Sequence, residues 1–389
     1  MRAAKLFATS LIALSLAACG NKEGTSSDPN AALVVKIGQA SPLTGPQAAI
    51  GKDNENGARL AVEDANAANI QINGKPVKFE LVSEDDQADP RQATLVAQKF
   101  ADARVNAVIG HLNSGTSIPA SKIYADANIA QISPSATNAK YTHQGFKTTF
   151  RVMANDEQQG KALASFVLHT LKVKSVAIID DKTAYGEGLA EEFRKGVEAG
   201  GVKVLASEHT DDKSVDFTAI LTKIKGEKPE LVFYGGMYPQ AGPMVSQMKK
   251  LGMPAKLLTG DGGCALEFIH LAGAAAPGHY CSLPGVPLEQ MPGGTKFKER
   301  YKTRFNIEIQ QYAPNAYDAA MAVVEAVKRA NATDAASIVA ALPKTEFPGV
   351  TSTIAFDEFG DIRNGTVTIY QYTAEGKTPV ETLGGAAAK

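Results

Sequence analysis

The sequence has no tryptophan, only three cysteines among its 389 residues, and no excess of one charge, since the formal net charge is −1. No block of Lys and Arg stands out, which argues against a nucleic acid partner because phosphate binding needs clustered basic side chains. Beyond the N-terminal segment, no apolar run approaches the roughly 18 residues of a membrane-spanning helix. The hydrophobic share of 44% is nevertheless enough for the cores of two ordinary domains.

Enzyme signatures are also missing. Gly186-Glu187-Gly188 lacks the third glycine of a dinucleotide fingerprint, and Gly376-Lys377-Thr378 lacks the leading glycine of a phosphate loop. No Gly-x-Ser-x-Gly elbow surrounds Ser114. The six histidines include no His-x-x-x-His pair for zinc. We therefore expect no enzymatic activity, no cofactor and no metal.

The N-terminal segment has the features of an export signal. A basic start precedes Leu6–Leu16, an apolar stretch that is too short to span a bilayer. Leu16-Ala17-Ala18-Cys19 then resembles a bacterial lipobox, in which the cysteine takes a diacylglyceryl group and becomes the mature N-terminus. We expect a lipoprotein signal peptide over residues 1–18 and a flexible tether over 19–32, with attachment to the membrane through this lipid only. The alternative is an ordinary secretory signal in which Cys19 has no role.

The other two cysteines, Cys264 and Cys281, lie 17 residues apart. In an oxidising compartment such a pair favours a disulfide. Two small buried hydrophobic residues are the alternative.

From Leu33 onward, short apolar runs alternate with amphipathic stretches every 10 to 20 residues, a pattern typical of βαβ units and parallel sheets. We expect strands in two series, at 33–38, 77–82, 107–109 and 129–132, and then at 175–179, 202–207, 231–234 and 256–259. Expected helices are 54–66, 90–100, 118–127, 157–171, 187–199, 217–225 and 240–251. The fold class is therefore α/β, with two successive doubly wound parallel-sheet domains of one architecture.

The remainder of the chain, from about Gly285, breaks this rhythm with several prolines and glycines. Helices are expected at 315–330 and 335–342, and strands at 352–356 and 367–372. This tail could complete either domain or both, and its last residues are expected to be frayed.

Small polar residues follow several of the expected strands. Asn113, Ser114 and Thr116 lie in one such loop, before a helix whose N-terminus would attract a carboxylate. The next loop, Ser133-Pro134-Ser135-Ala136-Thr137-Asn138, repeats this chemistry. In the second half, Tyr185 follows one strand, and Asp261 follows another between glycines that permit close approach of a ligand. Helix caps and plain turns are the alternatives for single loops, but two converging loops favour a binding site.

Taken in order, these blocks resemble the leucine/isoleucine/valine-binding protein family, the type I periplasmic receptors of branched-chain amino-acid ABC transporters. The likeness runs from Val34 to Asp361, and its stronger motifs are Leu43-Thr44-Gly45-Pro46, Asp85-Asp86-Gln87-Ala88-Asp89-Pro90, Ile109-Gly110-His111, Tyr185-Gly186-Glu187-Gly188 and Tyr234-Gly235-Gly236. The resemblance implies two lobes joined by a three-crossover hinge within residues 33–389. The first lobe would hold about 33–152 and 286–352, and the second about 153–285 and 353–383.

The resemblance also assigns roles in ligand binding. Ser114 matches the hydroxyl that binds the α-carboxylate, with Asn113 beside it, and Ser135, Ala136 and Thr137 match the loop whose backbone and hydroxyl bind the ligand. Tyr185 and Asp261 match the positions that hold the α-ammonium, where family members often have Glu in place of Asp261.

Two positions depart from the family pattern. Ile50 and Met237 stand where branched-chain binders commonly carry aromatic residues around the ligand side chain. The resemblance therefore implies a retained site for the amino-acid head group and a changed pocket for its tail.

The function expected from the resemblance is capture of a small aliphatic amino acid, such as Leu, Ile or Val, and its delivery to the permease subunits of an ABC transporter. The protein would be a monomer in the periplasm or on the cell surface, anchored to a bacterial membrane. A sensor or regulatory protein of the same fold, which binds amides or other small carboxylates, is the alternative.

Overall fold

The computed structural model describes residues 31–385. The expected signal peptide, 1–18, and the lipidation site, Cys19, lie outside the described residues.

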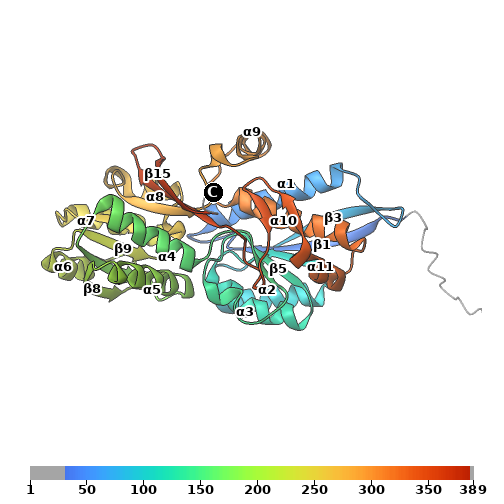
Figure 1. Ribbon diagram of the computed structural model, residues 1–389, viewed down its shortest axis with the longest axis horizontal. Helices are drawn as coiled ribbons and strands as arrows, with labels where there is room; N and C mark the ends of the chain where they lie inside the picture. Colours follow the sequence, from blue (N-terminus) through green and yellow to red (C-terminus); the bar gives the residue numbers. More distant parts are fainter. Residues whose placement is uncertain (1–30, 386–389) are drawn as a thin grey trace, which may run out of the picture. The chain divides into compact units, whose positions relative to one another are not determined.

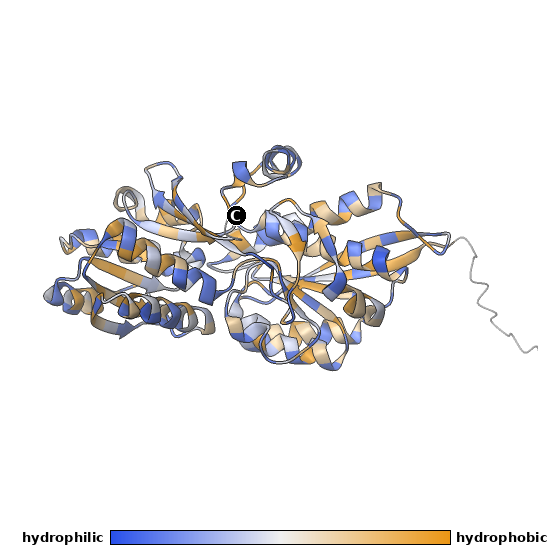
Figure 2. Cartoon of the chain, viewed as in Figure 1, coloured by the Kyte–Doolittle hydropathy of each residue, from blue (hydrophilic) through white to orange (hydrophobic). Residues whose placement is uncertain are grey.

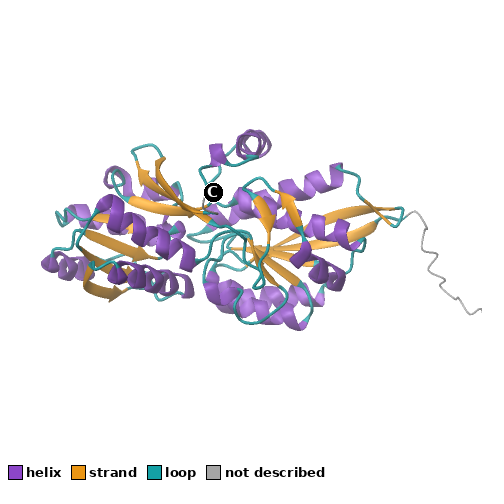
Figure 3. Cartoon of the chain, in the orientation of Figure 1, coloured by secondary structure: helices purple, strands orange, loops and turns teal. Residues whose placement is uncertain are grey.

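The first sheet has six strands in the order β2-β3-β1-β4-β5-β6, and all neighbours are parallel except β2 and β3. These strands are β1 (Leu33–Ser41), β2 (Gln71–Ile72), β3 (Lys75–Asp85), β4 (Ala107–Gly110), β5 (Ala130–Ser133) and β6 (Thr149–Arg151). Helices cover both faces of this sheet (Figures 1 and 3): α1 (Ala48–Ala67), α2 (Pro90–Asp102), α3 (Ser114–Asp126), α10 (Ala313–Ala330) and α11 (Ala335–Ala341).

Alternating strand residues supply the two apolar faces of the first sheet. Ile109 packs in the cluster that includes α1 and α10, whereas its neighbour Val108 packs in the cluster of α2 and α3. Both faces are buried, which explains why the parallel strands read as continuous apolar runs. In Figure 2 the strands are accordingly dominated by hydrophobic residues.

The second sheet has seven strands in the order β15-β14-β11-β10-β9-β7-β8. Strands β7 to β11 are parallel, and β14 and β15 add antiparallel to them. Their bounds are β7 (Ser175–Asp180), β8 (Lys203–His209), β9 (Leu231–Gly235), β10 (Lys256–Thr259), β11 (Tyr280–Pro284), β14 (Thr366–Tyr372) and β15 (Lys377–Gly384). The helices of this part are α4 (Asp156–Ser165), α5 (Ala184–Ala199), α6 (Thr218–Glu227), α7 (Tyr238–Lys250) and α8 (Glu267–Ala272).

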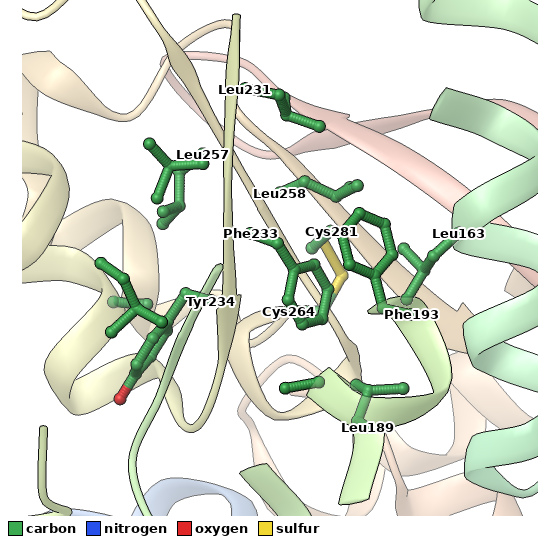
Figure 4. Close-up of a cluster of buried hydrophobic side chains, with 14 of the residues drawn as sticks. Leu163, Leu189, Phe193, Leu231, Phe233, Tyr234, Leu257, Leu258, Cys264 and Cys281 are labelled. Atoms are coloured by element: carbon green, nitrogen blue, oxygen red, sulfur yellow. A yellow bond between two sulfur atoms is a disulfide. The ribbon is translucent and has the colours of Figure 1, made fainter. Parts of the chain in front are cut away.

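The core of the second sheet is one large apolar cluster (Figure 4). Phe193 of α5 stacks on Phe233 of β9 with ring centroids 4.1 Å apart. Beside them, Cys264 and Cys281 are joined by a disulfide that links the loop after β10 to β11.

The order of five strands is the same in both sheets: β3-β1-β4-β5-β6 in the first and β8-β7-β9-β10-β11 in the second. The prediction of two doubly wound sheets of one architecture is therefore confirmed. The chain passes between the sheets three times: after β6, after β11 and before β14. The segment between the last two passages holds α9 (Gly294–Phe305), α10, α11 and the hairpin of β12 (Glu346–Pro348) and β13 (Thr353–Ala355).

Some boundaries differ from those expected. The helix expected to run to Leu171 is α-helical only as far as Ser165 and continues as a π-helical turn, Phe166–Leu171. Ile354 and Ile362 pack in the core of the first sheet, so the chain stays there about ten residues beyond the boundary expected at 352. The sequence pattern does not predict seven further elements: β2, β6, β11, β12, β15, α8 and α9. Most are short, and α9 follows the Pro- and Gly-rich stretch and carries several basic residues.

Candidate functional site

The N-terminus of α3 forms one wall of the candidate site. No side chain caps this helix, so the alternative in which the loop residues serve only as helix caps does not hold here. Ser114 is already its first helical residue, and Ser117 Oγ donates instead to the carbonyl of His111 at 3.0 Å. Uncapped amides at a helix start carry partial positive charge and attract an anion. Ser114 Oγ accepts from the amide of Asn138 at 3.1 Å, so its own proton is free to donate.

The loop after β5 lies next to this helix start. Ser135 Oγ donates to the carbonyl of Leu112 at 3.0 Å, which ties the two loops together. The amide of Ala136 is already bonded to Ser133 Oγ at 2.8 Å. Thr137 Oγ1 is buried and has no hydrogen-bond partner among the described residues.

A buried arginine fixes the position of this loop. The Nη1 atom of Arg151 donates to the carbonyls of Ala136 and Asn138, both at 2.9 Å, on either side of Thr137. Its Nη2 atom pairs with Asp361 at 2.6 Å. Desolvation of Asp361 is outweighed by the nearby Arg151 and by hydrogen bonds, so the pKa of this carboxyl is lowered. Arg151 is therefore fully engaged in holding the loop.

Asp261 faces these loops from the far side of the site, in the turn after β10. Its carboxylate accepts from Gln159 Nε2 at 2.9 Å, from Tyr185 Oη at 2.9 Å and from Tyr312 Oη at 2.6 Å. Burial raises the pKa of Asp261, and these three donors lower it only in part. Within residues 31–385 no Lys or Arg forms an ion pair with Asp261, so this buried acid is compensated by neutral donors alone.

Tyr312 is positioned by a second buried acid, Asp53 of α1. The Asp53 carboxylate accepts the backbone amides of residues 310, 311, 312 and 313 at 2.7–3.0 Å. This cluster of amides caps the start of α10 and orients the Tyr312 ring toward Asp261. Gly57, which follows Asp53 by one turn, allows the close packing, because a Cβ there would lie 2.1 Å from the carbonyl oxygen of Ala313.

A small cavity lies between these groups and is lined by Leu112, Asn113, Ser114, Ser135, Tyr185, Met237, Asp261, Gly262 and Tyr312. Gly262 keeps it open, since a Cβ at this position would lie 2.7 Å from the Tyr185 ring and 2.6 Å from Met237 Sδ. Six residues singled out from the sequence thus meet at one cavity: Asn113, Ser114, Ser135, Tyr185, Met237 and Asp261.

The other expected positions do not line the cavity as it stands. Ala136 and Thr137 lie beside it, and Ile50 is fully buried in the same apolar cluster as Leu112 and Met237. The cavity does have aromatic walls, Tyr185 and Tyr312. Both rings donate to Asp261, and the aliphatic Leu112 and Met237 line the cavity as well, so the changed pocket for the ligand tail stays a prediction.

Sequence reasoning missed Tyr312, which lines the cavity, and two polar residues of α4 near Asp261, Asp156 and Gln159. Gln159 bonds Asp261 twice, since its Oε1 atom also accepts the Asp261 amide at 3.0 Å. Asp156 is buried, and both of its carboxylate oxygens lack a partner among the described residues. An Asn-Asp pair followed by Gln at 155–158 forms a capping box, which was a signal for the start of α4 but not for a binding site.

We also searched the described part of the chain for a metal site and for a membrane-spanning helix. Residues 31–385 contain no cluster of three His, Cys, Asp or Glu side chains suited to a metal ion. They also contain no helix that is both long and apolar enough to span a bilayer.

Comparisons with known proteins agree with this arrangement of sheets and site. The model of the periplasmic binding protein family matches residues 34–377. The chain is 35% identical over 346 residues to Leu/Ile/Val-binding protein homolog 1 of Brucella abortus, covering 88% of this chain and 92% of that protein. It is 33% identical over 371 residues to the leucine-, isoleucine-, valine-, threonine-, and alanine-binding protein of Pseudomonas aeruginosa, covering 95% and 96%.

Solved structures give the same result. A leucine-binding protein from Thermotoga maritima superposes with a TM-score of 0.84 at 28% identity, over 90% of this chain and 98% of the other. The branched-chain amino acid transporter substrate-binding protein LivJ from Streptococcus pneumoniae, in complex with isoleucine, gives 0.83 at 29% identity, over 90% and 99%. The match extends over both sheets and the segments between them, and the chain belongs to the periplasmic binding protein family.

Proposed function

We propose that this protein is the extracytoplasmic substrate-binding component of an ABC transporter, and that it binds leucine, isoleucine or valine and delivers it to the permease subunits. The family consists of solute-binding proteins and not of enzymes. The relatives from Brucella and Pseudomonas are named for binding these amino acids, and the Streptococcus protein is in complex with isoleucine.

One observation carries the proposal: an anion-binding group and a buried acid line opposite sides of the same cavity. Ser114 and the start of α3 suit a carboxylate, whereas Asp261 suits an ammonium. An α-amino acid presents both groups on one carbon. Leu112 and Met237 leave an apolar remainder for the side chain.

We further propose that two lobes close over the ligand like a hinge. The first lobe comprises about residues 33–152 and 286–352, with the 353–362 segment packed on it, and the second comprises the rest. Contacts between the two sides support a closed arrangement: Tyr238 Oη donates to the carbonyl of Pro46 at 2.7 Å, and Asn138 Nδ2 donates to that of Ala184 at 2.6 Å. Because each side binds one half of the ligand, the ligand favours the closed state.

The energetics are adequate for a small ligand. Micromolar affinity needs about −8 kcal/mol. Burial of a leucine-sized side chain supplies roughly 2 kcal/mol. Hydrogen bonds to charged groups contribute roughly 1.5–3 kcal/mol each, so the head group supplies most of the remainder.

The test is to release small molecules by denaturing the purified protein and to identify them by mass spectrometry, followed by binding of labelled leucine. We expect a branched-chain amino acid that is recovered unchanged. Recovery of an amide or of a carboxylate without an amine would instead identify the sensor-like binding protein considered above. Chemical conversion of the leucine would contradict a pure binding function.

We also propose that Cys19 carries a lipid that holds the mature protein on a bacterial membrane. The support is the Leu16-Ala17-Ala18-Cys19 run and the polar tether after it. Cys19→Ser should release soluble protein, as judged by fractionation of expressing cells. A wild-type protein that is already fully soluble outside the cytoplasm would contradict the anchor.

A further inference from the structure

Asp156 is a buried acid that no described residue neutralises. It is the first residue of α4, and its amide donates to the carbonyl of Thr137 at 2.8 Å. The residue is 2% exposed, yet neither carboxylate oxygen has a hydrogen-bond partner within residues 31–385. An ionised carboxylate in this position costs several kcal/mol, so the group either holds a proton or awaits a cation.

The charged groups that face Asp156 come from three neighbouring elements. Asp261 lies in the turn after β10, Glu192 on α5 and Arg151 on β6. Burial and then the charge of Asp261 raise the pKa of Asp156 to about 8. The hydroxyl of Thr137, which lies near this carboxylate without meeting hydrogen-bond geometry, and the charge of Arg151 lower the pKa only in part. Arg151 is already bonded to Asp361 and to two carbonyls. It therefore acts on Asp156 through its charge and not through a hydrogen bond.

A count of acceptors shows that Asp261 alone has little room for an ammonium. A carboxylate has about four lone-pair sites, and an ammonium brings three donors. Three of the sites on Asp261 are taken by Gln159, Tyr185 and Tyr312. The unpartnered acceptors near it include the two oxygens of Asp156, Thr137 Oγ1, and Gln311 Oε1, whose Nε2 atom donates to the Asp261 carbonyl. Only Asp156 among these residues can carry a negative charge.

We propose that Asp156 and Asp261 form a two-carboxylate amine site that holds one proton when empty, and that the ammonium of the bound amino acid displaces this proton into the solvent. The inference rests on the proposed function and adds a proton to its binding equilibrium. Two buried carboxylates side by side do not ionise together without a cation, and the ammonium supplies that cation. The ligand keeps its own three amine protons, and the released proton comes from the carboxyl group.

The sign of the pH dependence follows directly. Below pH 8 the empty site is protonated and the occupied site is not, so binding releases a proton and affinity rises with pH. For one proton the dissociation constant falls by at most about tenfold for each pH unit between roughly pH 6 and 8. Above that range the empty site has already lost its proton, and the dependence flattens until the amine of the ligand itself titrates.

The test is calorimetry of leucine binding to the wild-type protein at pH 7.0 in phosphate and in Tris, two buffers that differ in their enthalpy of protonation. The difference in observed enthalpy measures the protons released, and we expect close to one. Asp156→Asn should bind leucine more weakly, release almost no proton, and lose the pH dependence between pH 6 and 8. Asp318→Asn is the matched control, since Asp318 is a buried acid bonded to Val350 and Thr351 and should leave proton release unchanged.

The outcomes separate this inference from the proposed function. Leucine binding with the same enthalpy in both buffers would overturn the shared proton and leave the function intact. This measurement needs only wild-type protein, so it decides the matter even if Asp156→Asn fails to fold. Failure of every aliphatic amino acid to bind would contradict the proposed function and the inference together.

Discussion

Tyr312 Oη lies 2.6 Å from Asp261 Oδ2 and thereby connects the start of α10, which packs on the first sheet, to a turn of the second sheet. The contact brings a phenol and a buried carboxylate from opposite sides of the cavity into one hydrogen bond. It therefore both shapes the amine site and contributes to closure.

Removal of this hydroxyl should weaken ligand binding. For Tyr312→Phe we expect a loss of roughly 1.5–3 kcal/mol, the range for a hydrogen bond to a charged group, or about 10- to 150-fold in Kd. Tyr317→Phe is the control, because Tyr317 donates to Asp64 at 2.8 Å on α1, away from the cavity. Calorimetry with leucine on both variants provides the comparison. Equal affinities for the two variants would mean that Tyr312 has no part in binding.

Asp261→Ala should cost more than any single hydroxyl, because it leaves the ammonium without this charge. By analogy with truncated buried charge pairs we expect 2–5 kcal/mol, or roughly 30- to several-thousand-fold weaker binding. Asp261→Asn should lose less, since the amide oxygen still accepts. Ser114→Ala should cost about 1–2 kcal/mol, because the amides of α3 still face the carboxylate. Binding by Asp261→Ala within threefold of wild type would point to a ligand without an amine.

The tail pocket should accept several apolar side chains. Met237 adapts its shape easily, although the rings of Tyr185 and Tyr312 limit how far the cavity can change. We expect leucine, valine, methionine and phenylalanine to differ by less than about a hundredfold in Kd, which corresponds to about 2.8 kcal/mol. Calorimetry with the four amino acids measures this directly. A larger preference for one of them would indicate a rigid pocket.

The disulfide between Cys264 and Cys281 should stabilise the protein more than it affects binding. Closing a loop of this length contributes about 3 kcal/mol in the chain-entropy model. We expect the Cys264→Ala, Cys281→Ala double variant to unfold at lower urea concentration with a similar Kd. Thiol counting on the unfolded, non-reduced wild type is the direct check. Two reactive thiols at these positions would exclude the bridge in the purified protein.

Asp156 should also make the stability of the ligand-free protein depend on pH. Its pKa is raised to about 8 in the folded protein, so between roughly pH 4 and 8 folding retains a proton that the unfolded chain has lost. The free energy of unfolding then falls as pH rises, by at most about 1.4 kcal/mol per unit for this group. In Asp156→Asn this component is absent, so the variant should gain stability relative to wild type up to pH 8. Urea unfolding at several pH values without ligand measures the difference, and a pH-independent gap would contradict the assignment.

The sequence predicts those site residues that follow a recognisable apolar strand. Ser114 follows a strand of the first sheet, and Tyr185 and Asp261 follow strands of the second, so their place at the carboxyl ends of parallel strands could be inferred. Tyr312 could not be found in this way, because it lies 51 residues beyond Asp261 in the segment where the strand–helix rhythm breaks. Asp156 resembled an ordinary helix start, and only its burial beside a second acid distinguishes it.

The threefold passage of the chain between the sheets has a consequence for how the protein is made. All six strands of the first sheet occur before residue 152, but helices α10 and α11, which cover one of its faces, begin only at Ala313 and Ala335. The second sheet likewise gains β14 and β15 only from Thr366 onward. Because the N-terminus is synthesised first, apolar faces of both sheets stay uncovered until nearly the last residue is available. Uncovered apolar faces are prone to aggregation. Holding the nascent chain unfolded until it is complete would avoid this risk.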